Sequence, residues 1–173
     1  MEIAPGEHYV NTGLILSAEQ ARAIDSILAS LRDRAPAALV LLTARDGQFI
    51  SACGDSLRRI DLVNLGSLIA GDLAASHQIA QLAGVYEDYQ AVLREGRNSH
   101  ILVADAGPQM VLFMLVSSTV PVGWARLIGR EAARALAEVV SNLPKGVDAP
   151  HRPSAGVDFP AELDKALGDL WRD

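Results

Sequence analysis

The dipeptide Asp46-Gly47 lies between two short apolar runs, and it constrains the fold more than any other feature of this chain. The runs cover residues 39–43 and 48–53, and each has the length of a β-strand. Aspartate followed by glycine favours a type I′ turn, in which both central residues adopt positive φ. The pattern therefore predicts an antiparallel hairpin, and its first strand is apolar enough to be covered on both faces.

A second hairpin is predicted further along the chain. Residues 99–104 and 110–117 are apolar runs separated by residues 105–109, which include glycine and proline. Residues 89–93 form another short run, joined to this hairpin by a polar segment in which Gly96 allows a bend. Short connections join antiparallel neighbours, so we expect one sheet of five antiparallel strands. The last run is the most apolar and is expected to be a central strand.

Three amphipathic helices alternate with these strands. Ser17 and Gln20 form a capping-box pattern, and apolar residues at helical spacing follow until Pro36. The same spacing recurs over residues 59–82 and 121–143. The element order is therefore α-β-β-α-β-β-β-α, an α+β fold with helices packed on an antiparallel sheet.

The chain is expected to divide into four parts. Residues 1–16 form an N-terminal extension, 17–143 the folded domain, 144–157 a linker and 158–173 a C-terminal amphipathic helix. The linker contains three prolines and two glycines and few apolar side chains. A single short helix is marginal in water, so we expect the C-terminal helix to dock on its own domain or on a partner.

The middle helix, residues 59–82, carries a stripe of small side chains. Each interior glycine costs a helix about 1 kcal/mol relative to alanine, so two glycines in one helix need a reason. One interpretation is tight packing against the helix's own sheet, and the other is a surface that a second helix or a partner approaches closely. The stripe consists of Gly66, Ser67, Ala70, Gly71, Ala74 and Ala75.

No catalytic, metal-binding or cofactor-binding motif is evident in the sequence. The four histidines are scattered, and His77 and His100 are interpreted as surface or capping residues rather than metal ligands. The chain has no phosphate-binding glycine loop and no nucleophile elbow, and Cys53 has no activating neighbour in the sequence. We therefore predict a protein without an active site, a metal or a cofactor.

Three arginines repeat at helical spacing on the last helix of the domain: Arg126, Arg130 and Arg134. The simpler interpretation is a solvated helix face that is partly paired with Glu131 and Glu138. The alternative is a contact for the acidic surface of a partner.

Composition narrows the class of protein. Fifteen Lys and Arg against 21 Asp and Glu give a formal net charge of -6, which argues against a nucleic-acid partner. A single cysteine fits a reducing compartment. No apolar run approaches the roughly 20 residues that a membrane span needs. We expect a cytoplasmic protein without a membrane span.

Four segments, read in order, resemble the roadblock / dynein light-chain family, and most of all its bacterial MglB-like branch. They are ALVLLTARDGQFIS, LGSLIAGDLAASHQIAQLAG, LREGRNSHILVADAGPQMVLFMLVSS and PVGWARLIGREAARALAEVV. The resemblance covers residues 17–143 and implies a five-stranded antiparallel sheet, with two helices on one face and the middle helix on the other. It also implies a homodimer, formed by pairing of the middle helices and of the strand edge at Tyr89, Ala91 and Leu93.

The resemblance implies a function as well: a homodimeric regulator of a Ras-like small GTPase of the MglA type. MglB-like proteins promote GTP hydrolysis by binding the GTPase and stabilising its competent arrangement, without an arginine finger. The six small residues of the middle helix match the family's GTPase-facing platform, and the C-terminal helix is expected to contact the GTPase or its own domain. The family also includes passive scaffold subunits, and the fold is shared with sensors of small ligands, so both remain alternatives.

Overall fold

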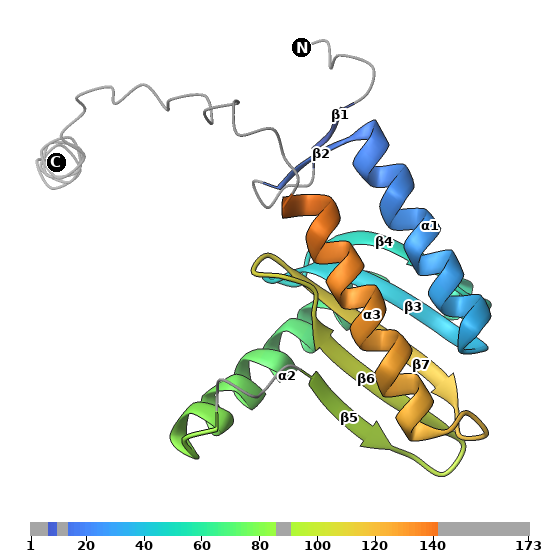
Figure 1. Cartoon of the computed structure of the whole chain (residues 1–173), viewed down its shortest axis with the longest axis vertical. Coiled ribbons are helices and arrows are strands. Elements are labelled where there is room, and N and C mark those ends of the chain that lie inside the picture. Colours follow the sequence, from blue (N-terminus) through green and yellow to red (C-terminus); the bar gives the residue numbers. More distant parts are fainter. Residues whose placement is uncertain (1–6, 10–13, 86–90, 142–173) are drawn as a thin grey trace, which may run out of the picture. The chain divides into compact units, whose positions relative to one another are not determined.

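The computed structural model describes residues 7–9, 14–85 and 91–141, and the linker and C-terminal helix expected after residue 143 lie outside them. Its elements (Figure 1) are β1 Glu7–Tyr9, β2 Ile15–Ser17, α1 Ala18–Arg34, β3 Ala37–Ala44, β4 Phe49–Cys53, η1 Leu57–Arg59, α2 Leu62–Leu82, β5 Ala91–Glu95, β6 Ser99–Asp105, β7 Met110–Ser117 and α3 Val122–Ser141. From α1 onward this is the predicted order of helices and strands. Within the described residues, no helix combines the length and apolarity needed to cross a membrane.

Strands β3 to β7 form one antiparallel sheet in the order β4-β3-β7-β6-β5. The two central strands, β3 and β7, pair over seven residue positions, with Leu41 opposite Phe113. Nearly all of their residues are buried, which confirms that both strands are covered on both faces. β5 pairs with β6 and forms one edge of the sheet, as predicted.

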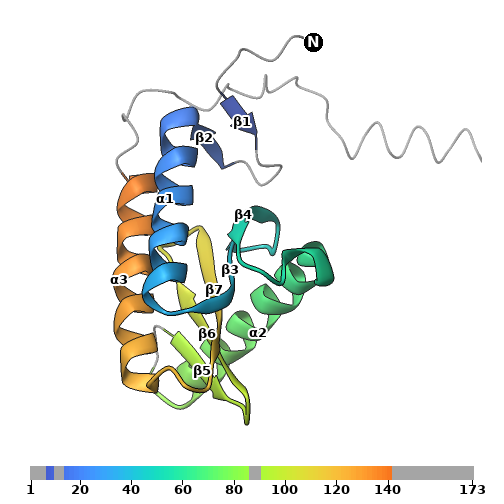
Figure 2. The same cartoon turned by 90° about the vertical axis from the view of Figure 1, so that its right-hand side faces the viewer.

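Helices α1 and α3 cover one face of the sheet and α2 covers the other (Figure 2). Side chains alternate between the two faces along each strand, so strands that are apolar throughout need a cover on both sides. On one side Leu28 of α1 and Ile128 of α3 belong to the core. On the other side Ile69 and Leu73 of α2 belong to a core with Phe113. This arrangement confirms the predicted fold class.

Helix α1 begins with the predicted capping box. The Ser17 hydroxyl accepts a hydrogen bond from the Gln20 backbone N–H at 3.1 Å, and the Gln20 side-chain oxygen accepts one from the Ser17 backbone N–H at 2.9 Å. Two N–H groups that the first helical turn would leave without partners are thereby satisfied. The helix ends at Arg34, two residues before Pro36.

The β3–β4 turn differs from the type I′ turn that was predicted. Gly47 has a φ of 90°, but Asp46 keeps a negative φ. The Gly47 N–H donates to the Ala44 carbonyl oxygen at 2.9 Å, and the Ala44 N–H donates to the Gln48 carbonyl oxygen at 2.8 Å. The loop therefore has three residues and ends in a left-handed glycine, another common hairpin geometry that Asp-Gly serves equally well.

The segment before α1 contributes two short strands that the sequence did not predict. β1 and β2 pair antiparallel, with Tyr9 opposite Ile15. Leu14 and Leu16 are buried in the same core as the inner faces of α1 and α3. A strand of three residues is too short to produce a recognisable alternation in the sequence.

Two boundaries also differ from the predicted ones. Helix α2 begins at Leu62 rather than at residue 59, because Asp61 caps it by accepting a hydrogen bond from the Asn64 N–H at 3.1 Å. The polar residues Arg94 and Glu95, expected in a turn, belong to β5. A segment of polar residues reads as a turn in the sequence, but an edge strand tolerates them because one side of it meets solvent.

Candidate functional site

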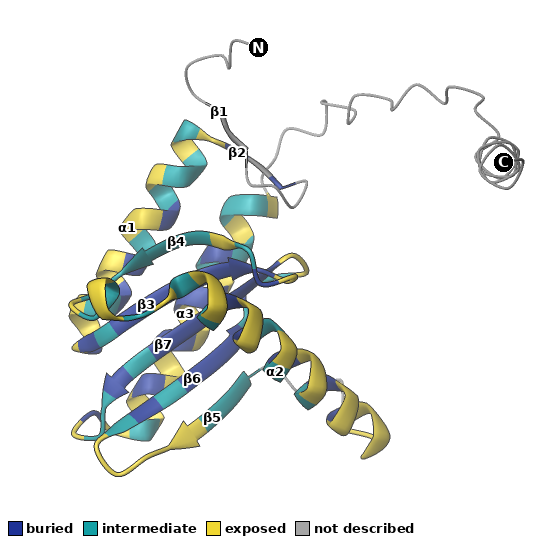
Figure 3. Ribbon diagram, turned by 180° about the vertical axis from the view of Figure 1, so that it is seen from behind, coloured by how far each residue is buried: buried dark blue, intermediate teal, exposed yellow. Residues whose placement is uncertain are grey.

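Helix α2 presents one side to the sheet and the opposite side to solvent (Figure 3). Its buried residues, which include Ile69, Leu73 and His77, recur at the spacing of a single helical face. The opposite side is exposed along the whole helix. We call these exposed residues the α2 face: Val63, Asn64, Ser67, Leu68, Gly71, Ala74, Ala75, Gln78, Ile79, Gln81 and Leu82.

The α2 face carries no charged side chain. The two ionisable residues of the helix lie elsewhere, since Asp72 is half-buried and His77 is buried. The outer faces of α1 and α3, by contrast, expose arginines together with aspartates or glutamates. Interface centres are depleted in charge relative to the rest of a protein surface, so the α2 face has the composition of a contact surface.

The largest apolar side chains of the α2 face are highly exposed. Val63 is 71% exposed, Leu68 65%, Ile79 67% and Leu82 89%. The apolar residues of this helix thus include both buried side chains, such as Leu73, and exposed ones, such as Ile79 and Leu82. Because α2 is apolar around most of its circumference, helical spacing alone does not reveal which side meets the sheet.

The six small residues of the predicted stripe do not share one environment. Gly66 is buried, and a Cβ there would overlap the carbonyl oxygen of Gly47 in the β3–β4 turn. At Gly71 a Cβ would meet no atom within 4 Å. Ala70 is half-buried, and the exposed members are Ser67, Gly71, Ala74 and Ala75. Tight packing therefore explains Gly66, whereas it does not explain Gly71.

His77 is a buried residue in a network of three side chains, not the surface histidine that was predicted. Its Nε2 lies 2.9 Å from Asp105 Oδ2, and Arg45 NH1 lies 3.0 Å from Asp105 Oδ1. Arg45 NH2 lies 3.0 Å from His77 Nδ1. The three residues come from α2, the end of β6 and the β3–β4 turn, so the network ties the helix to two turns. His100, also predicted at the surface, is 7% exposed on β6.

An ion pair joins α2 to the edge strand on the other flank of the helix. Both guanidinium NH2 groups of Arg94 in β5 donate to the carboxylate of Asp72, one of them at 2.6 Å. The hydrogen bond from Arg94 lowers the pKa of Asp72 below its ordinary value. The carboxylate is therefore ionised throughout the neutral range, and this flank of α2 is polar.

The predicted edge-pairing residues fall partly outside the described structure. Tyr89 lies outside the described residues, and Ala91 and Leu93 are in β5. Both of these side chains are half-buried and pack against the core on the α1 and α3 side. The groups that β5 presents for pairing at the edge of the sheet are therefore mainly its backbone N–H and C=O groups.

The three arginines of α3 are all exposed. Glu131 Oε2 pairs with Arg34 NH2 of α1 at 2.7 Å. Trp124 also contacts Arg34, since its indole N–H donates to the Arg34 carbonyl oxygen at 3.1 Å. These contacts fasten α3 to the end of α1.

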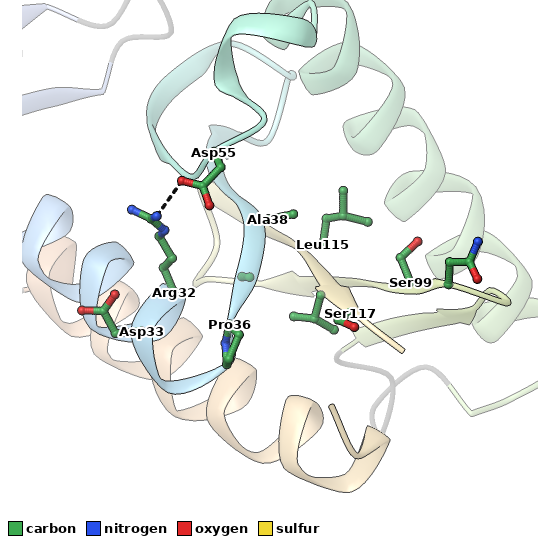
Figure 4. A pocket seen from close by; sticks show the side chains of 11 residues that line it. Arg32, Asp33, Pro36, Ala38, Asp55, Ser99, Leu115 and Ser117 are labelled. Carbon is green, nitrogen blue, oxygen red and sulfur yellow. Dashed lines mark hydrogen bonds and ion pairs between the residues drawn. The ribbon is translucent and has the colours of Figure 1, made fainter. Parts of the chain in front are cut away.

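A hollow of about 570 Å³ lies where α1 ends and β3 begins (Figure 4). Arg32 and Asp55 form an ion pair at its edge, with 2.7 Å between NH2 and Oδ1. Ser99, Leu115 and other polar and small apolar residues complete the lining. A ligand sensor needs a mostly apolar pocket with a few convergent polar groups, and this hollow does not match that description.

Two observations concern metal binding and thiol chemistry in the described residues. Among them, no group of three or more histidine, cysteine or acidic side chains is arranged to hold a metal ion. Burial raises the pKa of the Cys53 thiol, which keeps it protonated and a poor nucleophile at neutral pH. The candidate functional site is the α2 face.

Comparison with known proteins identifies relatives by structure. No family model and no curated protein matches the sequence. MglB from Myxococcus xanthus is 29% identical with a TM-score of 0.70, over 78% of this chain and 100% of that one. The gliding protein MglB from Thermus thermophilus is 25% identical with a TM-score of 0.69, over 76% of this chain and 98% of that one.

A third structure shows the fold alone. The roadblock/LC7 domain from Streptomyces avermitilis is 22% identical with a TM-score of 0.56, over 66% of this chain and 92% of that one. The two MglB structures agree with the resemblance of the four sequence segments, and both match along almost their whole length. The chain has the roadblock fold, and its two MglB relatives support a roadblock/MglB-like family.

Proposed function

We propose that this chain is a homodimeric regulator of a Ras-like small GTPase of the MglA type, which it binds through the α2 face. The observation that carries the proposal is an exposed helix face without charge, on which four large apolar side chains surround a patch of small residues. Leaving that much apolar surface in water is costly, and burying it against a partner recovers about 25 cal/mol per Å².

The regulator supplies no catalytic residue in this proposal. It accelerates hydrolysis by binding the competent conformation of the GTPase more tightly than the resting one. A 100-fold rise in rate needs a difference of about 2.7 kcal/mol. Burial of roughly 100 Å² more apolar surface in one conformation than in the other is enough for that difference.

Self-association is the second part of the proposal. Among the described strands, β5 pairs with β6 on one side only, and an unpaired edge is a template for another strand. A solved MglB structure that is 25% identical to this chain has a tetrameric arrangement. These observations support a dimer in which β5 pairs with β5 of a second copy.

The mass in solution tests self-association. Sedimentation equilibrium of the purified chain at micromolar concentration is expected to give at least twice the 18.4 kDa of a single chain. A dimer hides the sheet edge from water and from non-specific strand pairing, so it should persist on dilution. A single-chain mass at every concentration would contradict the proposal.

GTP turnover in the presence of this chain tests the regulatory function. With a Ras-like GTPase from the same genome in limiting amount, the chain is expected to bind the GTP-loaded form and to raise single-turnover hydrolysis at least about tenfold. Nucleotide exchange is followed in parallel with a fluorescent guanine nucleotide, so that hydrolysis and exchange are separated.

The same assay decides between this function and its main alternative. Binding without any change in hydrolysis or exchange would identify a scaffold subunit. Failure to bind any Ras-like GTPase from that genome, in either nucleotide state, would contradict both the regulator and the GTPase scaffold.

A further inference from the structure

A notch of about 380 Å³ runs along one flank of α2, on the side away from β5. Its floor is formed by buried residues, Leu73, His77 and Val111. Its rim is formed by small residues and two glutamines of α2 on one side and by Arg45 of the β3–β4 turn on the other. The residues of the rim are Arg45, Ala70, Ala74, Ala75, Gln78 and Gln81. The notch is therefore continuous with the α2 face.

The guanidinium group of Arg45 is held in one orientation at the mouth of this notch. A guanidinium only donates hydrogen bonds, so the contact between NH2 and His77 Nδ1 makes that nitrogen an acceptor. The other ring nitrogen, Nε2, lies 2.9 Å from Asp105 Oδ2. Asp105 in turn accepts from Arg45 NH1 at 3.0 Å, which closes the ring of contacts.

Arg45 is nevertheless available to a partner. Its side chain is 43% exposed, and the two contacts above use only two of its five N–H donors. An arginine whose rotamer is already fixed loses little side-chain entropy when it binds, so its hydrogen bonds contribute more to affinity. Among the described residues that line the notch, Arg45 is the one with a permanent charge.

We propose that the notch receives a carboxylate side chain of the GTPase that docks on the α2 face, and that Arg45 donates hydrogen bonds to it. The inference rests on the proposed function and names the polar anchor of the same surface. A planar guanidinium matches a carboxylate with two parallel hydrogen bonds. The amide groups of Gln78 and Gln81 at the rim supply further donors. The apolar part of the α2 face then provides affinity, and Arg45 selects the partner and its register.

The test is binding of the GTP-loaded GTPase to Arg45→Ala, measured by calorimetry beside the unchanged chain. A charge-assisted hydrogen bond at an interface predicts affinity weaker by about 10- to 100-fold. The mass in solution is expected to stay the same, because the dimer edge lies on the opposite flank of α2. The matched control is Arg22→Ala, which removes an exposed arginine from the outer side of α1 and is expected to bind normally.

A second variant covers the case in which Arg45→Ala loses stability through its lost contacts with Asp105 and His77. Arg45→Lys keeps a positive charge beside Asp105 but loses the planar fork, so it is expected to remain folded and to bind more weakly than the unchanged chain. A double-mutant cycle against each exposed Asp or Glu of the GTPase then identifies the carboxylate as the one whose removal adds nothing to Arg45→Ala.

The outcomes separate the two proposals. If the unchanged chain binds the GTPase and the Arg45 variants bind it equally well, the inference that the notch receives a carboxylate is wrong, and the proposed function stands. If the unchanged chain binds no GTPase, the proposed function is wrong, and so is the inference that the notch contacts a GTPase. Micromolar binding of free glutarate to the chain alone would also overturn the inference, by identifying a small-ligand site instead.

Discussion

Replacing Gly66 with alanine is expected to lower the free energy of unfolding by about 1 to 3 kcal/mol, the usual cost of overpacking a filled site. The added Cβ would overlap the Gly47 carbonyl oxygen and lie 3.2 Å from Thr43 Cγ2. Neither neighbour yields easily, because Gly47 is in a tight turn with a φ of 90° and Thr43 is fully buried in a central strand. Urea denaturation followed by circular dichroism measures the change.

Gly71→Ala is the matched control, because it makes the same change in the same helix. Its Cβ meets nothing within 4 Å, so only helix propensity acts, and stability is expected to rise by up to about 1 kcal/mol. The two variants are therefore expected to change the free energy of unfolding in opposite directions. Equal destabilisation by both variants would show that the space around Gly66 has been misjudged.

Gly71→Arg is expected to weaken binding of the GTPase on the order of 100-fold while leaving the protein folded. Position 71 is open, so a long side chain does not disturb the packing of α2 on the sheet. It does put a charge and a bulky group in the middle of an uncharged face, where a docked partner would have to desolvate it. Calorimetric titration with the GTP-loaded GTPase gives the affinity, and thermal unfolding gives the stability.

The control for the added charge is Ala29→Arg, at an exposed position of α1. It introduces the same side chain on the other side of the sheet and is expected to bind the GTPase like the unchanged protein. Ala70→Arg tests the boundary of the surface, because Ala70 is half-buried and lines the notch beside Arg45. Normal binding by both Gly71→Arg and Ala70→Arg would rule out the α2 face as the contact.

Local signals in the sequence were sufficient for most of the fold. The capping box at Ser17 and the two short hairpin connections depend on residues within a few positions of one another, and the structure has all of them. The edge position of β5 also follows from the order of strands. The predicted type I′ geometry of the β3–β4 turn was wrong, because Asp-Gly occurs both in type I′ turns and in three-residue loops that end in a left-handed glycine.

The sequence predicted only part of the candidate site. The stripe of small residues marks α2 as unusual, but it contains both a packing glycine, Gly66, and an open one, Gly71. Val63 and Leu68, two of the four large apolar side chains exposed on the α2 face, carried no signal of their own. In a helix that is apolar nearly all round, the buried side is chosen by the sheet it meets and not by its own periodicity.

The sequence by itself determined the order of helices and strands, the central and edge positions in the sheet, and the family resemblance, because these depend on neighbouring residues and on repeating patterns. Only the tertiary structure decided which side of α2 faces solvent. It alone brought Arg45, His77 and Asp105 within 3.0 Å of one another. His77 and Asp105 are 32 and 60 positions from Arg45, so their meeting depends on how the sheet and helix pack, which no local pattern encodes.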